Sequence, residues 1–445
     1  MAEPTILIIG AGTFGTSTAY HLSQRYKDPS RVTTIDRAPS PPEPSAAIDT
    51  NRIIRTDYAN PLYCDLACEA IHDWFWKLEL GEYFHKVGWL MLDEVGSDRA
   101  DKIRTTLESR GSTQTQDVDL DGLVKRWECL EGTQTKGFEK AYFNPEAGWC
   151  EAAAATKSIM DAAVKRGVQR VTASVKELLL DESGKGVRGI RTDDGKEFVA
   201  DKVILAAGAW TSSLLSPIED QLNIGEADRI ERQVRATGAV SAYYKMSDAE
   251  INRIETSRMP VSVYGQVGEV VPPSHKLPYL RYCNGQGTFT NTVSTKSGAK
   301  ISVPPSDQSQ YAVPEGLKQE TEEAITSKLM PSFTKAKRPD YWRICWDAVT
   351  PTDDWLMCKH PHPSLSNLFL AVGGSFHSYK FLPIAGKFMS NILEDKSNGV
   401  EKDKTWRWKE DAVWKNHQGN SALSRELRDL DSRTMGVSAR THSKL

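Results

Sequence analysis

The chain has 445 residues, a length typical of two or three domains, and 39% of them are hydrophobic. Its 56 Lys and Arg nearly balance 59 Asp and Glu, so charge gives no reason to expect nucleic acid or a membrane surface as a partner. No apolar run approaches the roughly 18 residues of a membrane helix. The start MAEPTILIIGAG lacks a secretory signal, so we expect an intracellular protein. The seven cysteines are scattered without a CxxC pair, which predicts no metal site.

In chain order, the first predicted elements are a strand at 5–9, a glycine-rich turn, a helix to about Tyr26 and a strand ending at Asp36. An aromatic-rich helix is predicted to about Leu78. On it, Cys64, Cys68, Ile71 and Phe75 have the spacing of a buried face. A strand at 87–92, a helix from 151, a hairpin leading to a strand before 208, and an irregular β-rich stretch over 216–340 follow. The last elements are a strand at 368–374 and a helix from about 383.

The glycine-rich turn carries the first functional signal. Gly10, Gly12 and Gly15 form GxGxxG between a strand and a helix, and Asp36 ends the next strand. In this context the first glycine permits the tight turn, the second admits a pyrophosphate, and the third allows the helix to pack on the strand. The helix N-terminus then offers free N–H groups to phosphates, and the carboxylate accepts ribose hydroxyls. The unit predicts a dinucleotide-binding fold.

The motif alone does not decide between NAD and FAD. LAAGAWTSSLL at 205–215 and LFLAVGGSFHSYKFLPIAGK at 368–387 each place a glycine turn after an apolar strand. Flavoproteins with this architecture return to the dinucleotide fold in that way, so both segments favour FAD by fold analogy. The alternative, an NAD(P)-dependent dehydrogenase, is supported only by the first 36 residues.

From ILIIGAGTFGTSTAYHL through NRIIRTDY, VILAAGAW, RICW and SFHSYKFLP, the chain resembles the monomeric sarcosine oxidase family. That family includes amadoriases (fructosyl amino acid oxidases), pipecolate oxidases and saccharopine oxidases. The resemblance implies an α/β fold of the D-amino-acid-oxidase type, with a Rossmann-like FAD domain interleaved with an α+β substrate domain that contains an antiparallel sheet. We expect the FAD domain over 1–85, 140–215 and 340–400, the substrate domain over 86–139 and 216–339, and a C-terminal extension over 401–445.

The resemblance also implies where the cofactor binds. Cys345, in RICW, matches the cysteine that is bonded to the flavin in this family, and Cys358 is the nearby competitor. The predicted cofactor-binding residues are Gly10, Gly12, Thr13, Phe14, Gly15, Asp36, Arg37, Asn51, Arg52, Val175, Gly208, Trp210, Cys345, Gly373, Gly374 and Lys380.

The substrate carboxylate has two predicted partners. Arg55 can bind it with two parallel hydrogen bonds, and Lys380 adds a point charge. Holding the carboxylate places the α-carbon beside the flavin, and Lys380 and Arg52 would also stabilise the reduced flavin. His377 and Tyr58 are expected nearby by family analogy, and no side-chain base is assigned.

The chain departs from the family pattern at two places. Arg281 stands where members carry the lysine that promotes the reaction with oxygen, and Lys276 is the alternative if the alignment shifts. Phe376 and Ser378 flank His377 where members have glycines, so we expect a reshaped pocket and a substrate larger than sarcosine.

The expected reaction is FAD-dependent oxidation of a secondary amine to an imine, with hydrolysis and release of hydrogen peroxide. The expected partners are an N-substituted amino acid of the saccharopine, pipecolate or fructosyl type and molecular oxygen. Two alternatives are a biosynthetic oxidase whose imine closes a ring, and a flavoprotein that has lost turnover. The terminal Ser443-Lys444-Leu445 is a peroxisomal address, so the import receptor and the peroxisome are expected as partner and location.

Overall fold

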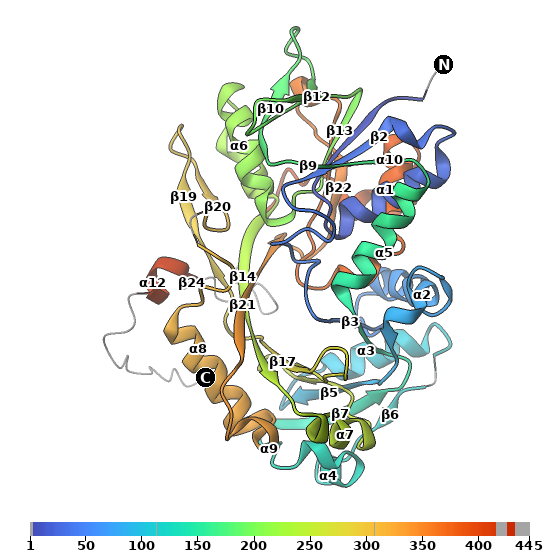
Figure 1. The fold of residues 1–445 in the computed structure, drawn as a ribbon, viewed down its shortest axis with the longest axis vertical. Helices are drawn as coiled ribbons and strands as arrows, with labels where there is room; N and C mark the ends of the chain where they lie inside the picture. The colour runs from blue at the N-terminus through green and yellow to red at the C-terminus, as the bar shows by residue number, and fades with distance from the viewer. Residues whose placement is uncertain (1–2, 113, 307, 415–424, 432–445) are drawn as a thin grey trace.

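The computed structural model describes residues 3–112, 114–306, 308–414 and 425–431. Two sheets dominate the molecule. In Figure 1 the parallel sheet and its helices form the upper part, and most strands of the larger sheet lie below. The long strands β14 (Arg235–Lys245) and β21 (Tyr341–Val349) run side by side between the two parts.

The parallel sheet has the order β22-β23-β13-β1-β2-β9. Its strands are β1 (Ile6–Ile9), β2 (Val32–Asp36), β9 (Gln169–Thr172), β13 (Lys202–Leu205), β22 (Leu356–Lys359) and β23 (Leu368–Val372). All neighbours pair in parallel except β22 and β23. The two strands predicted from the first 36 residues therefore lie side by side near the centre, with β13 on the other side of β1.

Alternate residues of β1 pack into the two different cores on either face of the parallel sheet. Ile6 and Ile8 pack with α1 (Thr13–Arg25), α5 (Ala152–Lys165) and α10 (Ala385–Leu393) on one face. Leu7 and Ile9 pack on the other face against α6 (Thr211–Gln221) and the small sheet β10-β11-β12. That sheet is formed by β10 (Val175–Leu180), β11 (Val187–Thr192) and β12 (Glu197–Val199). A parallel sheet covered on both faces needs such apolar strands.

The larger sheet contains ten strands of the described chain, in the order β24-β18-β14-β17-β16-β15-β5-β7-β6, with β21 paired to β14. Its other strands are β5 (Trp89–Glu94), β6 (Gln116–Asp117), β7 (Phe138–Asn144), β15 (Val261–Tyr264), β16 (Gly268–Val271), β17 (Tyr279–Asn284), β18 (Phe289–Thr290) and β24 (Arg425–Glu426). The pairing is antiparallel except for β5 with β15 and β18 with β24. The two-domain division stays a prediction, but β21 and most of β7, which fall in the segments assigned to the FAD domain, pair into this sheet.

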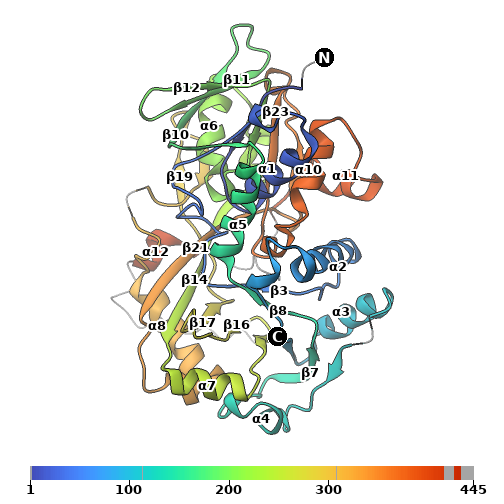
Figure 2. The ribbon, with the colours of Figure 1, turned by 45° about the vertical axis from the view of Figure 1, so that its right-hand side comes forward.

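The remaining elements surround these sheets (Figure 2). A small sheet joins β3 (Arg52–Ile54), β8 (Gly148–Cys150) and β4 (Phe84–His85), and β19 (Thr292–Ser294) pairs with β20 (Lys300–Ser302). The other helices are α2 (Pro61–Trp76), α3 (Arg99–Glu108), α4 (Leu123–Arg126), α7 (Asp248–Thr256), α8 (Glu315–Ala324), α9 (Pro331–Thr334), α11 (Val400–Trp406) and α12 (Leu427–Asp431). In the described part of the chain, every helix is too short or too polar to cross a membrane.

One expectation about α2 was wrong. Cys64 is buried, but Cys68 is exposed, and Ile71 and Phe75 are only half-buried. The buried face of α2 instead follows Leu62, Leu66, Ala70 and Trp74 and their neighbours. They belong to the same core as Ile6 and Ile8 of β1. The helix is apolar on more than one side, so the spacing of four residues could not identify its inner face.

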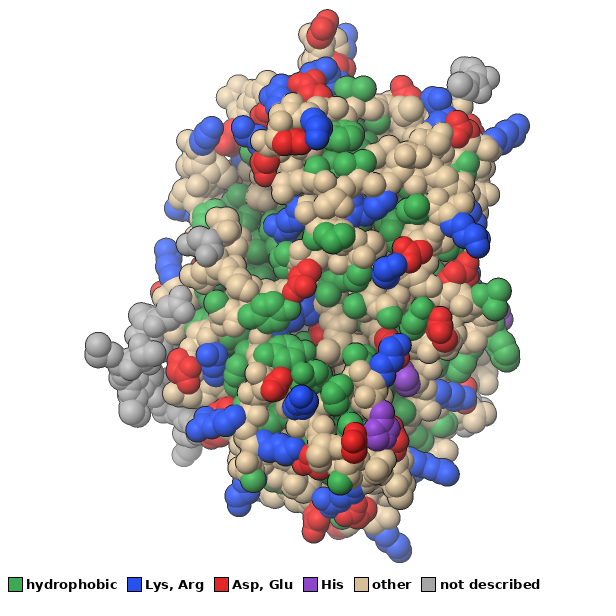
Figure 3. All heavy atoms as spheres, viewed as in Figure 1, with side chains coloured by type: hydrophobic (Ala, Val, Ile, Leu, Met, Phe, Trp, Pro, Cys, Tyr) green, Lys and Arg blue, Asp and Glu red, His purple; other side chains and the backbone are tan. Residues whose placement is uncertain are grey.

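The surface carries charges of both signs. On the face shown in Figure 3, lysine and arginine side chains are interspersed with aspartate and glutamate. This mixture agrees with the formal net charge of −3.

Candidate active site

A cavity of about 830 Å³ runs from the glycine turn after β1 to the loop after β23, and both large sheets contribute to its walls. This volume lies in the upper part of the range of ligand sites, roughly 300–1,000 Å³. Of the residues predicted from the sequence, Gly10, Gly12, Thr13, Phe14, Asp36, Arg37, Arg52, Arg55, Val175, Gly208, Trp210, Arg281, Cys345, Gly373, Gly374, His377 and Lys380 line it. Gly15 and Asn51 lie behind the wall. Among the described residues, no group of three His, Cys, Asp or Glu could hold a metal ion.

The glycine turn has the geometry that its motif requires. Gly10 has φ of +100°, and a Cβ there would lie 2.4 Å from the carbonyl oxygen of Ala206. A Cβ on Gly15 would lie 1.9 Å from the carbonyl oxygen of Gly10. Glycine is therefore required at Gly10 for the close approach of the turn to the end of β13, and at Gly15 for the close packing of α1 on β1 and its turn.

The N-terminus of α1 opens into this cavity without a partner of its own. Gly12 caps the helix and provides no side-chain cap, and the first turn contains no acidic residue. Its free N–H groups can therefore donate hydrogen bonds to a bound anion. Asp36 lies next to the turn, where its Oδ2 accepts a hydrogen bond from the Ala11 amide at 2.8 Å.

Arg55 and Lys380 meet at the other end of the cavity. The Arg55 guanidinium lies over the rings of Tyr58 and Trp89, 4.6 and 5.0 Å from their centroids. Its buried Nη1 has no hydrogen-bond partner in the part of the chain that the structure describes. Lys380 Nζ donates to Tyr58 Oη at 2.9 Å and to the His377 carbonyl at 2.5 Å. Burial, and then the nearby Arg55 cation, lower the pKa of Lys380 well below its ordinary value.

His377 is held as a neutral ring beside this pair. Its Nδ1 lies 3.1 Å from Tyr58 Oη, and its Nε2 lies 2.8 Å from the Asp353 carbonyl oxygen. Burial, followed by repulsion from Lys380, lowers the pKa of His377 to about 3. The ring therefore orients neighbouring groups rather than carrying charge at neutral pH.

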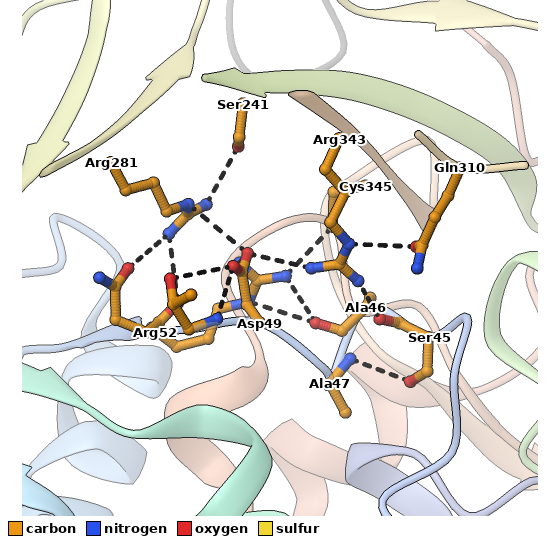
Figure 4. Close-up of polar contacts among 12 residues, drawn as sticks. Ser45, Ala46, Ala47, Asp49, Arg52, Ser241, Arg281, Gln310, Arg343 and Cys345 are labelled. Atoms are coloured by element: carbon orange, nitrogen blue, oxygen red, sulfur yellow. Dashed lines mark hydrogen bonds and ion pairs between the residues drawn. The ribbon is translucent and has the colours of Figure 1, made fainter. Parts of the chain in front are cut away.

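Asp49, Arg52, Arg281 and Arg343 form a buried cluster of charges (Figure 4). The Asp49 carboxylate forms ion pairs with Arg52, with Arg281 at 3.5 Å and with Arg343 at 3.2 Å, and it accepts a hydrogen bond from Tyr243 at 2.6 Å. Burial favours the protonated acid, but the three guanidinium groups hold the pKa of Asp49 well below its usual range. One anion thus faces three cations, and the cluster retains a net positive charge.

Cys345 is connected to this cluster. It is 7% exposed and lines the cavity, and its Sγ lies 3.2 Å from Arg52 Nη2. Arg52 is itself fixed by Asp49 and by the Ala46 carbonyl oxygen, which accepts from Nη2 at 2.7 Å. The competing Cys358 lies on β22 beside β23 and is not among the residues that line the cavity.

The loop after β23 is strained where it borders the cavity. Ser375 and Phe376 have φ of +45° and +59°, which is uncommon for residues with a side chain. The half-buried Asp347 carboxylate holds the loop, because it accepts a hydrogen bond from the Phe376 amide at 2.7 Å. A Cβ on Gly374 would lie 2.7 Å from the same carboxylate. Backbone strain of this kind is concentrated at functional sites.

Comparison with known proteins identifies the family. The model of the FAD-dependent oxidoreductase family matches residues 5–392. The chain belongs to this family of FAD-dependent oxidoreductases. An L-saccharopine oxidase of Schizosaccharomyces pombe is 26% identical over 435 residues, covering 92% of this chain and 93% of the relative. A monomeric sarcosine oxidase of a Bacillus species is 26% identical over 399 residues, covering 87% and 91%.

A solved structure extends the likeness to three dimensions. A modified fructosyl peptide oxidase from Aspergillus nidulans superposes with a TM-score of 0.82 at 27% identity, covering 96% of this chain and 98% of that one. The resemblance to sarcosine, saccharopine and fructosyl amino acid oxidases is confirmed, and so is the fold class. The alternative of an NAD(P)-dependent dehydrogenase is set aside, because the matching family uses FAD.

The residues present fit FAD as the cofactor of this FAD-dependent oxidoreductase. The unpartnered N-terminus of α1 suits a pyrophosphate, and Gly208, with φ of +53° and open space around it, allows a ligand to approach the backbone. Arg37 stacks on Trp210 at 4.1 Å from the ring centroid, beside the same part of the cavity.

Sequence reasoning missed several charged residues of this site. Asp49 and Arg343 complete the cationic cluster, and Glu269 and Arg99 line the cavity. A signal existed for the first two. Asp49 stands three residues before Arg52 in the sequence. Arg343 stands two residues before Cys345, so alternation along β21 places Arg343 and Cys345 on the same face.

Proposed function

We propose that the chain uses FAD and molecular oxygen to oxidise the C–N bond of an N-substituted amino acid. The observation that carries this proposal is the Arg55 guanidinium. Its buried Nη1 has no partner in the described structure, and it faces the cavity that begins at the dinucleotide motif. A buried donor without an acceptor is costly, so its presence indicates that a ligand supplies the acceptor.

A carboxylate meets this requirement best. A carboxylate can accept two parallel hydrogen bonds from the fork of Arg55, with the aromatic rings of Tyr58 and Trp89 supporting the guanidinium. Lys380 is held in place by Tyr58 and by the His377 carbonyl, so it would donate a hydrogen bond to the carboxylate from a fixed position. When bound, FAD supplies the oxidising chemistry, accepting a hydride from the carbon next to nitrogen and returning the electrons to oxygen as hydrogen peroxide.

The substrate test is a panel of secondary amines that includes saccharopine, pipecolate, fructosyl amino acids and sarcosine. The proposal expects at least one to bleach the flavin under argon and to release peroxide in air. Bound flavin that no N-substituted amino acid reduces would contradict it.

We further propose that FAD is bonded covalently to Cys345. The support is its position: Cys345 is buried in the cavity wall, where its sulfur faces the ligand space and lies 3.2 Å from the fixed Arg52 guanidinium. After acid precipitation, the yellow chromophore should stay with the protein. It should be released from Cys345→Ala and retained by the matched control Cys358→Ala. Release from the unaltered protein would contradict the bond.

Arg281 is proposed as the cation that promotes the reaction with oxygen. It lines the cavity, and although burial opposes its charge, Asp49 raises the pKa of Arg281 well above its usual value. Lys276 is exposed and forms an ion pair with Glu151 at 2.5 Å, away from the cavity wall. Arg281→Met should therefore slow reoxidation by oxygen far more than reduction by substrate, whereas Lys276→Met should change neither rate.

Peroxisomal location and binding by the import receptor are proposed from Ser443-Lys444-Leu445, which lie outside the described residues. An oxidase that releases peroxide suits that compartment. Full chain labelled at its N-terminus should accumulate in peroxisomes, and removal of Leu445 should leave it in the cytosol. An unchanged distribution would contradict the address.

A further inference from the structure

A line of tyrosine rings leads from the buried Asp49 cluster to the surface. Tyr243 on β14 is fully buried, and its hydroxyl donates a hydrogen bond to Asp49 Oδ1 at 2.6 Å. Its ring stacks on the ring of Tyr341 on β21, with the centroids 4.1 Å apart and the planes at 11°. The next ring outward is that of Tyr311, whose centroid lies 6.3 Å from Tyr341. Tyr311 is 49% exposed, so three rings in sequence connect the interior with solvent.

Tyr341 also contacts a second tyrosine near the surface. Tyr279, the first residue of β17, packs edge-on against it at 5.2 Å, and the Tyr279 hydroxyl donates to Asp340 Oδ2 at 3.2 Å. The Tyr311 hydroxyl donates to the Glu43 carboxylate. Three of these four phenols, the two outer ones and the innermost one, therefore have a carboxylate as acceptor. A phenol releases its proton when it loses an electron, and these carboxylates are placed to receive it.

The inner end of the line adjoins the cavity that fits FAD. Tyr243 is directly opposite Arg281 on β17, and Arg281 lines the cavity. Residues paired in this way lie on the same face of a sheet, with Cβ atoms roughly 5 Å apart. Tyr243 is also directly opposite Tyr341 on β21. The strand β14 thus places Tyr243 between a residue of the cavity wall and the next ring of the line.

The outer end of the line is fixed to the same strand. Gln310, the neighbour of Tyr311, accepts a hydrogen bond from Arg343 Nε at 3.1 Å through its side chain (Figure 4). Its carbonyl oxygen accepts from the Ile344 amide at 2.7 Å. These bonds hold the loop that carries Tyr311 against β21. Fixed spacing matters, because electron exchange between aromatic groups falls steeply with their separation.

The surrounding charges favour movement of an oxidising equivalent outward. Tyr243 lies against a cluster in which one carboxylate faces three guanidinium groups, and this net positive charge opposes removal of an electron. Tyr311 and Tyr279 bond to carboxylates outside that cluster, which favour it. An electron is therefore lost more easily from the outer tyrosines, and they can replace one that Tyr243 has lost.

We propose that Tyr243, Tyr341 and Tyr311 form a path along which one-electron oxidising equivalents leave the cofactor cavity for the surface. Tyr279 provides a second exit. This electron transfer is an activity beside amine oxidation, and it does not depend on which amine the enzyme oxidises.

The electrons and protons balance as follows. A one-electron oxidant in the cavity, such as a radical formed from hydrogen peroxide, takes an electron from Tyr243, whose phenolic proton passes to Asp49. Tyr311 supplies the replacement electron through Tyr341 and gives its proton to Glu43, while Tyr243 recovers its own proton. A soluble thiol or ascorbate then reduces Tyr311, which recovers its proton from Glu43. The net result is one electron moved from solution to the oxidant.

The test uses the FAD-loaded full chain under argon, with blue light making the bound flavin the oxidant. An excited flavin takes one electron from a neighbouring side chain and normally returns it at once. It keeps the electron only if another donor replaces the one that was lost. With ascorbate in solution as the donor, the tyrosine path should make this replacement, so the flavin should bleach progressively in the light.

Two variants interrupt the path at different points. Tyr341→Phe keeps the stacked ring but removes the phenol, and a benzene ring is much harder to oxidise, so most of the light-driven bleaching should be lost. The double variant Tyr279→Phe/Tyr311→Phe removes both exits near the surface and should lose it as well. Tyr244→Phe is the matched control. Tyr244 is the next residue of β14 and belongs to the core on the opposite face, and its hydroxyl has no hydrogen-bond partner among the described residues.

A radical trap locates the exit in the unaltered protein. When the trap replaces ascorbate, peptide mass spectrometry should find its adduct on Tyr311 or Tyr279 after illumination, and the adduct should be absent from both in Tyr341→Phe. The Tyr244→Phe control should carry the same adducts as the unaltered protein.

Two results would overturn the inference. One is equal bleaching by the unaltered protein and by both path variants with retained flavin, which would mean that ascorbate reaches the cavity directly. The other is an unaltered protein with adducts on neither Tyr311 nor Tyr279. Failure of every N-substituted amino acid to reduce the flavin would bring down the proposed function but not this path, because light rather than an amine drives the test.

Discussion

Buried charges around the cavity fall into two groups, those with a partner inside the protein and those without one. Asp49 has three guanidinium groups and a tyrosine hydroxyl around it, so its charge is satisfied before any ligand binds. The Nη1 of Arg55 has no acceptor among the described residues. The first arrangement is expected to govern stability and the second to govern binding.

Arg55→Met should lower kcat/KM for the preferred amine by roughly hundredfold, because two charge-assisted hydrogen bonds to the carboxylate are lost. It should not lower the free energy of unfolding, since it removes an unpaired buried donor. Steady-state peroxide release and urea unfolding measure the two effects. Arg104→Met on α3 is the control for charge. A variant that loses stability in proportion to activity would show that Arg55 is structural.

Asp49→Asn should destabilise the protein by about 3–5 kcal/mol, because three buried cations lose their shared anion. The direction in which stability changes with pH follows from the depressed pKa of Asp49. Its contribution is present above the ordinary aspartate value of about 4 and is lost as pH falls through the folded-state value. The variant should therefore show a flatter acid limb in urea midpoints. Glu197→Gln removes the charge of an exposed ion pair with Arg191 and should change the midpoint much less. Equal shifts for Asp49→Asn and Glu197→Gln would contradict the larger contribution expected of Asp49.

At the scale of elements, sequence patterns predicted what is local. The strand, glycine turn, helix and strand of residues 5–36 lie within one continuous stretch, so spacing alone places Gly10 and Asp36. The Asp49 cluster could not be found in that way. Arg281 comes from β17 and Arg343 from β21, and Arg52 and Cys345 are 293 positions apart. Pairing of β14 with both strands brings Arg281 and Arg343 together, and the packing of the segment before β3 adds Asp49 and Arg52.

The corner between α6, the turn at Ile230–Arg232 and β20 contains a half-buried acid, Glu231. Glu231 accepts hydrogen bonds from Ser212 Oγ at 2.8 Å and from the Ser302 amide at 3.0 Å, which ties the three elements together. Burial is the main cause that raises the pKa of Glu231 to about 8. The folded protein therefore binds this proton more tightly than the unfolded chain does.

Stability should fall as pH rises from about 4.5 towards 8, because the folded-state pKa of Glu231 lies above the unfolded value. Glu231→Gln keeps a hydrogen-bond acceptor without an ionisable group, so it should reduce this loss. Urea midpoints between pH 5 and 9 for both proteins give the measurement. Parallel curves would mean that Glu231 ionises in the folded protein as readily as in the unfolded chain.

At the scale of the whole molecule, the cavity lies between the two large sheets, and residues of both line it. The sequence predicted the parallel sheet but left 216–340 as irregular β structure, because short strands with mixed pairing lack a clear period. That region contributes Glu269, Arg281 and Cys283 to the cavity wall. A cofactor bound in this cavity would therefore contact both halves of the fold.

FAD bound between the sheets should stabilise both of them together, and the mode of attachment decides how that stability depends on free FAD. If Cys345 holds the flavin covalently, the unfolding temperature of the purified protein should not change when FAD is added. In Cys345→Ala the flavin can dissociate, so stability should rise with free FAD, by about 2.7 kcal/mol at a hundredfold excess over Kd. Thermal unfolding over a series of FAD concentrations distinguishes the two cases, with Cys358→Ala expected to behave like the unaltered protein. An FAD-dependent unfolding temperature in the unaltered protein would argue against the covalent bond, and independence in Cys345→Ala would place the attachment at another residue.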